Sequence, residues 1–231
     1  MKPTGSFRGL IFDFNGVLLW DDQIQRDSWR AFAWRLCQRR LSDDEIDIHV
    51  HGRNGQYTLE YLLGEPIDFQ KSTVLTEQKE AIYRELYLNS DGDFKLSPGA
   101  AELLDDLVKQ EIPITIATAS GRKNVDFFVE YLNLEKWFEI GKIVFDDGKT
   151  QGKPAPDLYI SAAKKLRLPP QACVVIEDSR SGIQAAQAAG AGWLVALGPV
   201  ETHQNLAKLP GVNRVITNLG QVSPHDLFKR V

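Results

Sequence analysis

The sequence predicts an α/β protein with a Rossmann-like parallel sheet, helices on both faces of the sheet, and an inserted α-helical cap domain. Three observations lead to this fold class. Short apolar runs alternate with helical patterns from residue 97 onward, one apolar run stands apart near the N-terminus, and the stretch between them is helical with little strand signal. Alternating strands and helices are typical of a parallel sheet covered on both faces.

The expected strands are short apolar runs bounded by turn residues, a pattern of buried strands. The first run begins at Gly9 and ends just before Asp13, ahead of the turn-forming pair Asn15-Gly16. The later strands are expected at residues 112–118, 143–145, 173–176, 193–197 and 214–216. Helices are expected between them at residues 101–109, 125–132, 157–166 and 183–189.

The helical stretch after the first strand predicts an inserted domain. Residues 29, 32, 33 and 36 are apolar at the i, i+3, i+4, i+7 spacing of one helix face, and residues 77–88 repeat such a pattern. We therefore expect a cap domain at residues 20–91, and a core domain made of residues 1–19 and 92–231.

The amino-acid composition limits the classes of molecule that this protein is expected to bind. The chain has 231 residues, 43% of them hydrophobic, and a net charge of −4, which gives no basic footprint for nucleic acid or for a membrane surface. No apolar stretch reaches the length of a membrane span, and the two cysteines have neither zinc-site nor disulfide-framework spacing. We expect a cytoplasmic protein that binds a small molecule and needs no obligate protein partner.

Polar residues follow several of the expected strands. Asp13 follows the first strand, Thr118-Ala119-Ser120 ends the second, and Glu177-Asp178 follows the run at residues 173–176, while Lys153 lies in a Gly-Lys-Pro-Ala-Pro loop. Because ligands bind beyond the carboxyl ends of the strands in open α/β sheets, we expect these side chains to converge at one edge.

Their chemistry suits phosphoryl transfer. Three carboxylates at close range are costly without a divalent cation, and hard oxygen ligands favour Mg²⁺. The Thr118 hydroxyl and the following N–H groups offer donors to a phosphoryl oxygen, and Lys153 adds positive charge. Transfer of a phosphoryl group to Asp13 would give an aspartyl phosphate, which water then hydrolyses.

These motifs resemble those of the haloacid dehalogenase-like (HAD) superfamily, in particular its β-phosphoglucomutase and phosphoglycolate phosphatase-like branch. The matching motifs are Asp13-Phe-Asn-Gly-Val, Thr118, Gly-Lys153-Pro-Ala-Pro and Glu177-Asp178-Ser. The resemblance implies a Mg²⁺-dependent phosphatase that acts on a small phosphorylated metabolite, with Asp13 as nucleophile. It further implies Mg²⁺ held by Asp13, the backbone carbonyl of Asn15 and Asp178, with Glu177 contributing directly or through water.

The chain departs from the family pattern in three places. Asn15 stands where the family has an Asp that acts as general acid and base, whose loss typically lowers the rate by ~10²–10⁴. Gln25 and Gly55 stand where a phosphomutase would have a cap His and a phosphate-gripping Arg. Arg53 is then the best cap candidate for a substrate anion, with a plain surface arginine as the equal alternative.

Several readings stay open beside the phosphatase. Asn15 also fits a low-activity relative that binds a ligand or a protein, and a haloacid dehalogenase or a phosphomutase is a further alternative. The pair His49 and His51 has a spacing that could bind a metal, but no third nitrogen or sulfur ligand stands nearby in the sequence. We therefore expect neither histidine to be a ligand.

Overall fold

The computed structural model describes residues 7–90, 95–148 and 151–228, and its centre is a parallel six-stranded sheet. The strand order is β3-β2-β1-β4-β5-β6, in which the chain steps outward from β1 in one direction and then resumes on its other side. The strands are β1 Gly9–Phe12, β2 Ile114–Gly121, β3 Val144–Asp146, β4 Cys173–Glu177, β5 Trp193–Leu197 and β6 Val212–Ile216.

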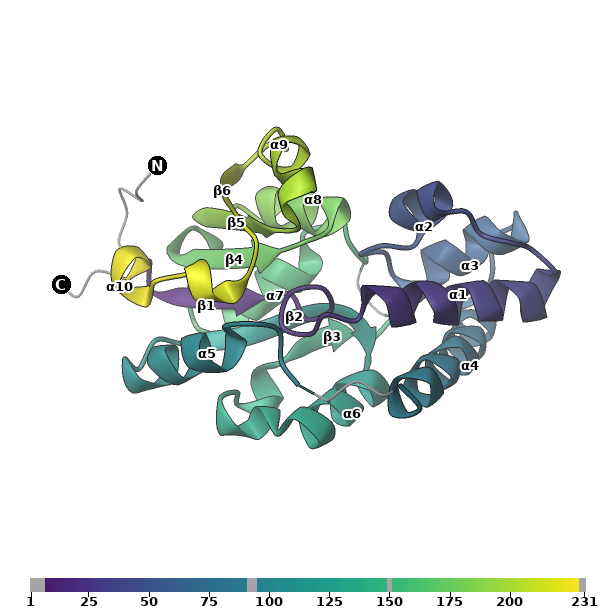
Figure 1. Ribbon diagram of the computed structural model, residues 1–231, viewed down its shortest axis with the longest axis horizontal. Helices are drawn as coiled ribbons and strands as arrows, with labels where there is room; N and C mark the ends of the chain where they lie inside the picture. Colours follow the sequence, from purple (N-terminus) through teal and green to yellow (C-terminus); the bar gives the residue numbers. More distant parts are fainter. Residues whose placement is uncertain (1–6, 91–94, 149–150, 229–231) are drawn as a thin grey trace.

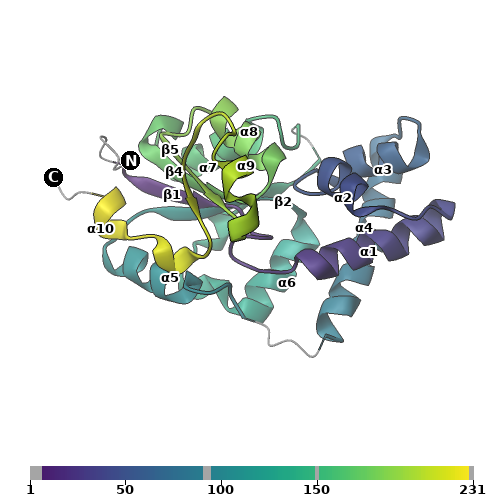
Figure 2. The ribbon, with the colours of Figure 1, turned by 45° about the horizontal axis from the view of Figure 1, so that its top comes forward.

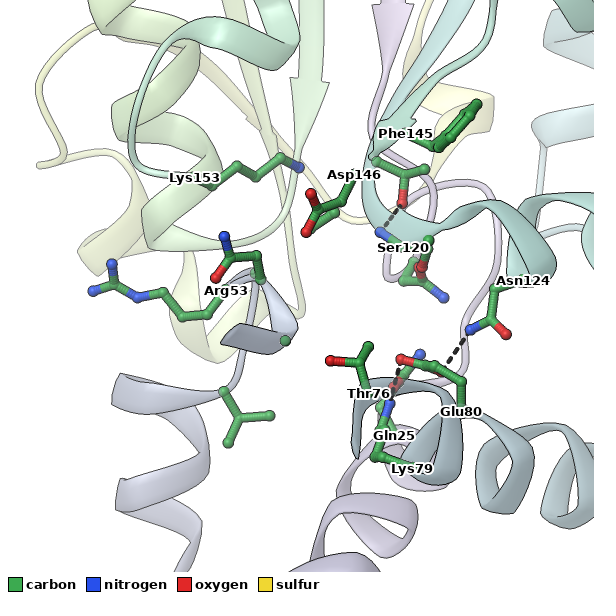
Figure 3. A pocket seen from close by; sticks show the side chains of 18 of the residues that line it. Gln25, Arg53, Thr76, Lys79, Glu80, Ser120, Asn124, Phe145, Asp146 and Lys153 are labelled. Atoms are coloured by element: carbon green, nitrogen blue, oxygen red, sulfur yellow. Dashed lines mark hydrogen bonds and ion pairs between the residues drawn. The ribbon is translucent and has the colours of Figure 1, made fainter. Parts of the chain in front are cut away.

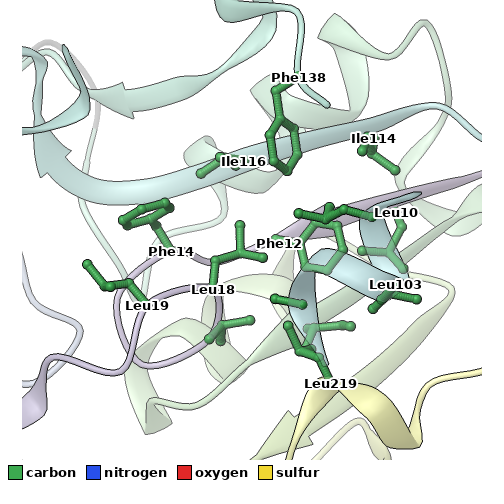
Figure 4. Packing of buried hydrophobic residues seen from close by; sticks show 14 of the residues in the cluster. Leu10, Phe12, Phe14, Leu18, Leu19, Leu103, Ile114, Ile116, Phe138 and Leu219 are labelled. Carbon is green, nitrogen blue, oxygen red and sulfur yellow. The ribbon is translucent and has the colours of Figure 1, made fainter. Parts of the chain in front are cut away.

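The two faces of the sheet are both apolar, as expected where helices cover each face. Side chains of β1 alternate between the faces: Leu10 and Phe12 pack in one core cluster and Ile11 in the other. Figure 4 shows Phe12 with Phe138 on the first face, where their rings meet edge to face at a centroid distance of 6.2 Å. This double burial fixes β1 at the centre of the sheet.

Helices of the core lie on both sides of the sheet (Figure 1). Helices α5 and α6 pack against one face, and α7 and α8 against the other. Their bounds are α5 Ala100–Lys109, α6 Arg122–Leu132, α7 Asp157–Lys165, α8 Arg180–Ala188, α9 His203–Leu206 and α10 Pro224–Leu227. Short 3-10 segments occupy Leu134–Lys136, Ile140–Lys142, Pro170–Ala172, Val200–Thr202 and Leu219–Gln221.

Four helices, which we call the cap helices, separate β1 from the rest of the sheet in the sequence. They are α1 Asp22–Cys37, α2 Asp43–His49, α3 Gly55–Leu63 and α4 Phe69–Leu88. The starts of α2, α3 and α4 follow local capping chemistry, since the side chains of Ser42, Asn54 and Asp68 each accept a backbone N–H three residues later. Leu59, Phe32 and Ile82 belong to a third core cluster within these helices.

The cap helices lie beyond the carboxyl ends of the strands, and Figures 1 and 2 show this from two directions. The structure thus confirms the predicted α/β fold with a helical insertion. The predicted boundary at residues 91/92 falls outside the described residues, so the division into 1–19 with 92–231 and 20–91 stays a proposal. Among the described residues, no helix combines the length and apolar content that a membrane-spanning segment needs.

Candidate active site

Asp13 lies at the carboxyl edge of the sheet between β1 and β4. Its backbone N–H donates to the carbonyl oxygen of Ile176 at 3.0 Å, which holds the end of β1 beside the end of β4. These two strands flank the point where the strand order reverses, the usual ligand site of an open α/β sheet. The Asp13 side chain is buried, so its charge needs a partner.

Lys153 supplies that partner from the loop before α7. Its Nζ lies 2.6 Å from Asp13 Oδ1 and 2.5 Å from Glu177 Oε1, and its side chain is buried. One ammonium group therefore bridges the carboxylate that follows β1 and the carboxylate of the last residue of β4. The sequence predicted these three residues at one edge, and the structure brings them into direct contact.

Glu177 is enclosed by hydrogen-bond donors. Besides Lys153, its Oε1 accepts the hydroxyl of Tyr159 at 3.1 Å, and its Oε2 accepts the backbone N–H of Ser179 at 2.7 Å and the Ser179 hydroxyl at 3.0 Å. A Cβ atom on Gly182 would lie 1.6 Å from Oε1, so only glycine leaves room for this carboxylate. Glu177 acts here as the anchor of Lys153, and its predicted role at the metal stays a prediction.

Burial and the charge of Lys153 have opposite effects on the pKa values of Asp13 and Glu177. Burial raises the pKa of Asp13 to about 8, and the charge of Lys153 limits that rise. Burial also raises the pKa of Glu177, but Lys153 and the Ser179 donors outweigh it, and the net shift is downward. The Lys153 pKa is raised because the attraction of the two carboxylates exceeds the effect of burial. Lys153 is therefore charged at neutral pH.

The acidic cluster fits a divalent cation. Carboxylate oxygens of Asp13, Glu177 and Asp178 lie within 4.8 Å of one another, against the single charge of Lys153. A Cβ atom on Gly16 would lie 1.9 Å from Asp178 Oδ2, so the chain after β1 approaches Asp178 as closely as a glycine permits. Oxygen donors with excess negative charge are what Mg²⁺ prefers. The donor set agrees with the predicted metal.

Thr118, Ala119 and Ser120 at the end of β2 line the same cavity as Asp13. The backbone N–H of Ser120 donates to Thr118 Oγ1 at 3.1 Å, which leaves the Thr118 hydroxyl hydrogen free to donate to a ligand. Helix α6 begins two residues later at Arg122. The expected donors for a phosphoryl group and the carboxylate of Asp13 therefore border one cavity.

Both polar atoms of the Asn15 side-chain amide form hydrogen bonds. Its Nδ2 donates to Asp21 Oδ2 at 2.7 Å, and its Oδ1 accepts the hydroxyl of Ser120 at 2.9 Å. The same Asp21 oxygen also accepts Gln25 Nε2 at 3.1 Å and the Tyr83 hydroxyl at 2.6 Å. Asp21 is buried, and these donors from the cap helices fix the position of Asn15.

A cavity of about 510 Å³ lies between the strand ends and the cap helices. Figure 3 shows Lys153 and Asp146 on the core side, and Gln25, Lys79 and Glu80 on the opposite side. Buried Lys79 donates to Gln25 Oε1 at 2.8 Å and to Glu80 Oε1 at 3.0 Å. This part of the cavity wall is therefore polar, whereas Trp29, Ile46, Val50 and Phe69 of the cap segment line other parts of it with apolar surface.

Arg53 lines this cavity, but its guanidinium group packs on the ring of Tyr57. Its guanidinium carbon lies 4.6 Å from the centre of the Tyr57 ring, a cation–π contact. In Figure 3 the guanidinium extends away from Ser120 and Asp146. Arg53 as a substrate contact stays a prediction that needs a turn of the side chain.

Sequence reasoning set aside a residue that reaches the site. His51, in the loop between α2 and α3, places Nε2 3.1 Å from Asp178 Oδ2. The sequence contains no signal that predicts this contact, because the two residues are 127 positions apart. His49 instead stacks on Tyr61 with a centroid distance of 3.8 Å, within the cap helices.

Comparisons with known proteins agree with this geometry. A family model for the haloacid dehalogenase-like hydrolases matches residues 7–190. Protein CbbY from Rhodobacter capsulatus is 32% identical over 189 residues, 79% of this chain and 82% of that protein. A phosphorylated carbohydrates phosphatase from Thermotoga maritima is 28% identical over 186 residues, 78% of this chain and 81% of that protein.

Solved structures share the same architecture. The crystal structure of a HAD hydrolase of family IA, variant 3, from Entamoeba histolytica has a TM-score of 0.84 and 36% sequence identity, covering 95% of this chain and 97% of that chain. The predicted family and the predicted hydrolase class are confirmed. The chain belongs to the haloacid dehalogenase-like hydrolases, in the branch of phosphatases and phosphoglucomutase-like enzymes.

Proposed function

We propose that this protein is a Mg²⁺-dependent phosphatase that hydrolyses a small phosphorylated metabolite through an aspartyl phosphate at Asp13. The observation that carries the proposal is the contact of Lys153 with both Asp13 and Glu177, opposite the Thr118 donor edge. A buried carboxylate with an adjacent ammonium is arranged to attack an anionic phosphoryl group, because the positive charge offsets the repulsion between the anions.

In the proposed first step, an Asp13 carboxylate oxygen forms a bond to phosphorus while the bond from phosphorus to the leaving oxygen breaks, and the leaving oxygen takes a proton from solvent water. Thr118 Oγ1 and the N–H group of Ala119 hold the phosphoryl oxygens, and Lys153 balances their charge. The Ser120 N–H, which donates to Thr118 Oγ1 in this structure, joins them by giving up that hydrogen bond. In the second step water attacks phosphorus and releases a proton to the solvent, the bond to Asp13 breaks, and inorganic phosphate leaves.

The proposed Mg²⁺ ligands are the carboxylates of Asp13 and Asp178 and the backbone carbonyl of Asn15. When bound, Mg²⁺ would neutralise charge on the phosphoryl oxygens during transfer. Glu177 completes the acidic cluster, but both of its oxygens already accept donors, so we place it behind Lys153. The excess of carboxylates over lysine in the cluster supports a cation there.

The proposed substrate class is a small phosphorylated, hydroxyl-bearing metabolite. The polar part of the cavity wall, with Gln25, Lys79 and Glu80, offers donors and acceptors suited to hydroxyl groups. The relatives named for a phosphorylated carbohydrates phosphatase and for a fructose-1-phosphate phosphatase support the same class. Closure of the cap helices over the cavity would exclude water and select the substrate.

A low-activity relative that binds a ligand is the second candidate, and Asn15 favours it. The Asn15 amide has no proton to give to a leaving oxygen and cannot take one from water. Transfer without a positioned acid is slower by ~10²–10⁴, so the same site could bind well and turn over little.

Steady-state phosphate release tests the proposal. The panel consists of small phosphate esters and an activated aryl phosphate, each with Mg²⁺ or with EDTA, for the wild type, Asp13→Asn and Asn15→Asp. We expect Mg²⁺-dependent release that is lost in Asp13→Asn. If none of the three proteins releases phosphate from any substrate while ligand binding is intact, the phosphatase proposal is overturned. The ligand-binding relative of low activity would then be the remaining candidate function.

A further inference from the structure

His51 connects the cap helices to a carboxylate of the acidic cluster. It lies in the loop between α2 and α3, and its Nε2 is 3.1 Å from Asp178 Oδ2. An ionised carboxylate can only accept a hydrogen bond, so Nε2 carries the hydrogen and donates. The contact therefore holds one oxygen of Asp178.

The same loop is fixed against the start of α8. The Ser181 hydroxyl donates to the carbonyl oxygen of Gly52 at 2.9 Å. Gly52 has a φ of 68°, and a Cβ atom there would lie 2.2 Å from Ser179 Oγ, so this approach requires glycine. His51 thus reaches Asp178 from a segment that is docked on the residues following it.

Asp178 Oδ2 is enclosed on two sides. His51 lies on one side, and on the other the backbone at Gly16 leaves no room for a Cβ atom, which would stand 1.9 Å from Oδ2. Oδ1 is the Asp178 oxygen that His51 leaves for another partner.

We propose that His51 is a positioning residue for the metal site: by holding Asp178 Oδ2 it orients Oδ1 toward the cation. This inference rests on the proposed Mg²⁺ site of the phosphatase. Carboxylates that bind metals are commonly held by a hydrogen bond to the oxygen that does not bind the metal. Loss of such a hydrogen-bond partner typically lowers the metal affinity by roughly 10–100-fold.

If His51 competes with the cation for Asp178, the change in metal affinity on removing His51 has the opposite sign. If His51 took the place of the cation at Asp178, its removal would vacate that place and tighten metal binding. The sign of the change in metal affinity therefore decides between the two, without any turnover measurement.

The experiment measures Mn²⁺ binding to the full-length protein without substrate, from the free Mn²⁺ signal in electron paramagnetic resonance. The proteins are the wild type, His51→Ala, His51→Gln and the control His49→Ala. His49 pairs with Tyr57 and Tyr61 inside the cap helices, so its removal tests the general effect of losing a histidine there. Thermal unfolding with EDTA checks that each variant is folded.

We expect His51→Ala to weaken Mn²⁺ binding by about tenfold or more. His49→Ala should bind as the wild type does, and His51→Gln should recover part of the affinity because its amide can donate to Oδ2. Unchanged or tighter binding in a folded His51→Ala, or no Mn²⁺ binding by the wild type, would overturn the inference.

The two proposals can fail separately. A phosphatase with metal-dependent turnover whose Mn²⁺ affinity is unaffected by His51→Ala would refute only the positioning role. A protein that hydrolyses no phosphate ester but loses Mn²⁺ affinity in His51→Ala would keep the positioning role and refute only the phosphatase.

Discussion

Asn15 Nδ2 donates to Asp21 Oδ2 at 2.7 Å, so a buried carboxylate lies directly against the residue that stands in place of the family's acid. An aspartate at position 15 would meet Asp21 with like charge at this distance. Two carboxylates in contact cannot both ionise without a large penalty, and one pKa of the pair rises strongly. The effect of Asn15→Asp is therefore expected to depend on whether Asp21 is changed with it.

We predict that Asn15→Asp alone raises phosphatase turnover less than the double variant Asn15→Asp with Asp21→Ser. A full acid and base effect is worth ~10²–10⁴ in rate, and the double variant should approach it while the single variant falls at least about tenfold short. The measurement is kcat for an alkyl phosphate, with Asp21→Ser alone as the control. Equal rates for the single and double variants would show that Asp21 does not oppose an acid at position 15.

Lys153 sets the stability of the site. Lys153→Met keeps the side-chain volume but leaves Asp13 and Glu177 buried without their cation. Breaking a buried ion pair by removing one partner costs about 3–5 kcal/mol. We expect a loss of that size in urea unfolding with EDTA, and a smaller loss with Mg²⁺ present. A change below ~1 kcal/mol in EDTA would mean that the carboxylates do not depend on Lys153.

Gly182 should be intolerant of any side chain. A methyl group there would lie 1.6 Å from Glu177 Oε1, so Gly182→Ala must displace the anchor of Lys153. We expect a loss of about 1–3 kcal/mol in unfolding free energy together with most of the turnover. Gly141→Ala is the matched control, since nothing lies within 4 Å of a Cβ atom there. Similar behaviour of the two variants would contradict the packing argument.

Glu45 gives the cap helices a pH-dependent contribution to stability. It accepts the Ser42 N–H at 3.0 Å, the Tyr61 hydroxyl at 2.7 Å and Arg39 at 2.6 Å, and these donors lower its pKa to about 2. Because the unfolded pKa is near 4.5, the unfolded chain binds more protons between the two values. The contribution is present above pH ~4.5 and is lost as pH falls toward 2.

We therefore predict that Glu45→Gln lowers the melting temperature at pH 6 and that this difference shrinks between pH 4.5 and pH 3, roughly the window set by the two pKa values. Glu65→Gln serves as the control, since Glu65 is exposed and its contact with Lys71 is 3.4 Å long. A difference for Glu45→Gln that stays constant over this range would refute the role of its charge.

The strands and the polar residues after them could be predicted from sequence because both are local signals. Asp13, Thr118 and Glu177 each end an apolar run, and parallel strands bring such ends to one edge. The hydrogen bonds of Glu177 could not be predicted, because Tyr159 meets it only when α7 packs on the sheet. The same holds for His51, whose distance from Asp178 depends on where the cap helices dock.

Asn15 shows a different limit of sequence analysis. Its departure from the family pattern is visible in the chain, but its partner Asp21 is not, because a turn after Phe14 has to bring the two together. Arg53 was chosen by charge and position, and its stacking on Tyr57 depends on a rotamer that the sequence does not specify.

The most direct test of the account is to trap the phosphorylated enzyme. The protein is mixed with an activated aryl phosphate and Mg²⁺, quenched in acid, digested and analysed by mass spectrometry. We predict a peptide carrying one added phosphoryl group at Asp13, accumulating because Asn15 cannot activate water, and absent in Asp13→Asn and with EDTA. Phosphate release without a phosphorylated Asp13, or release that persists in Asp13→Asn, would contradict the assignment of Asp13 as the nucleophile.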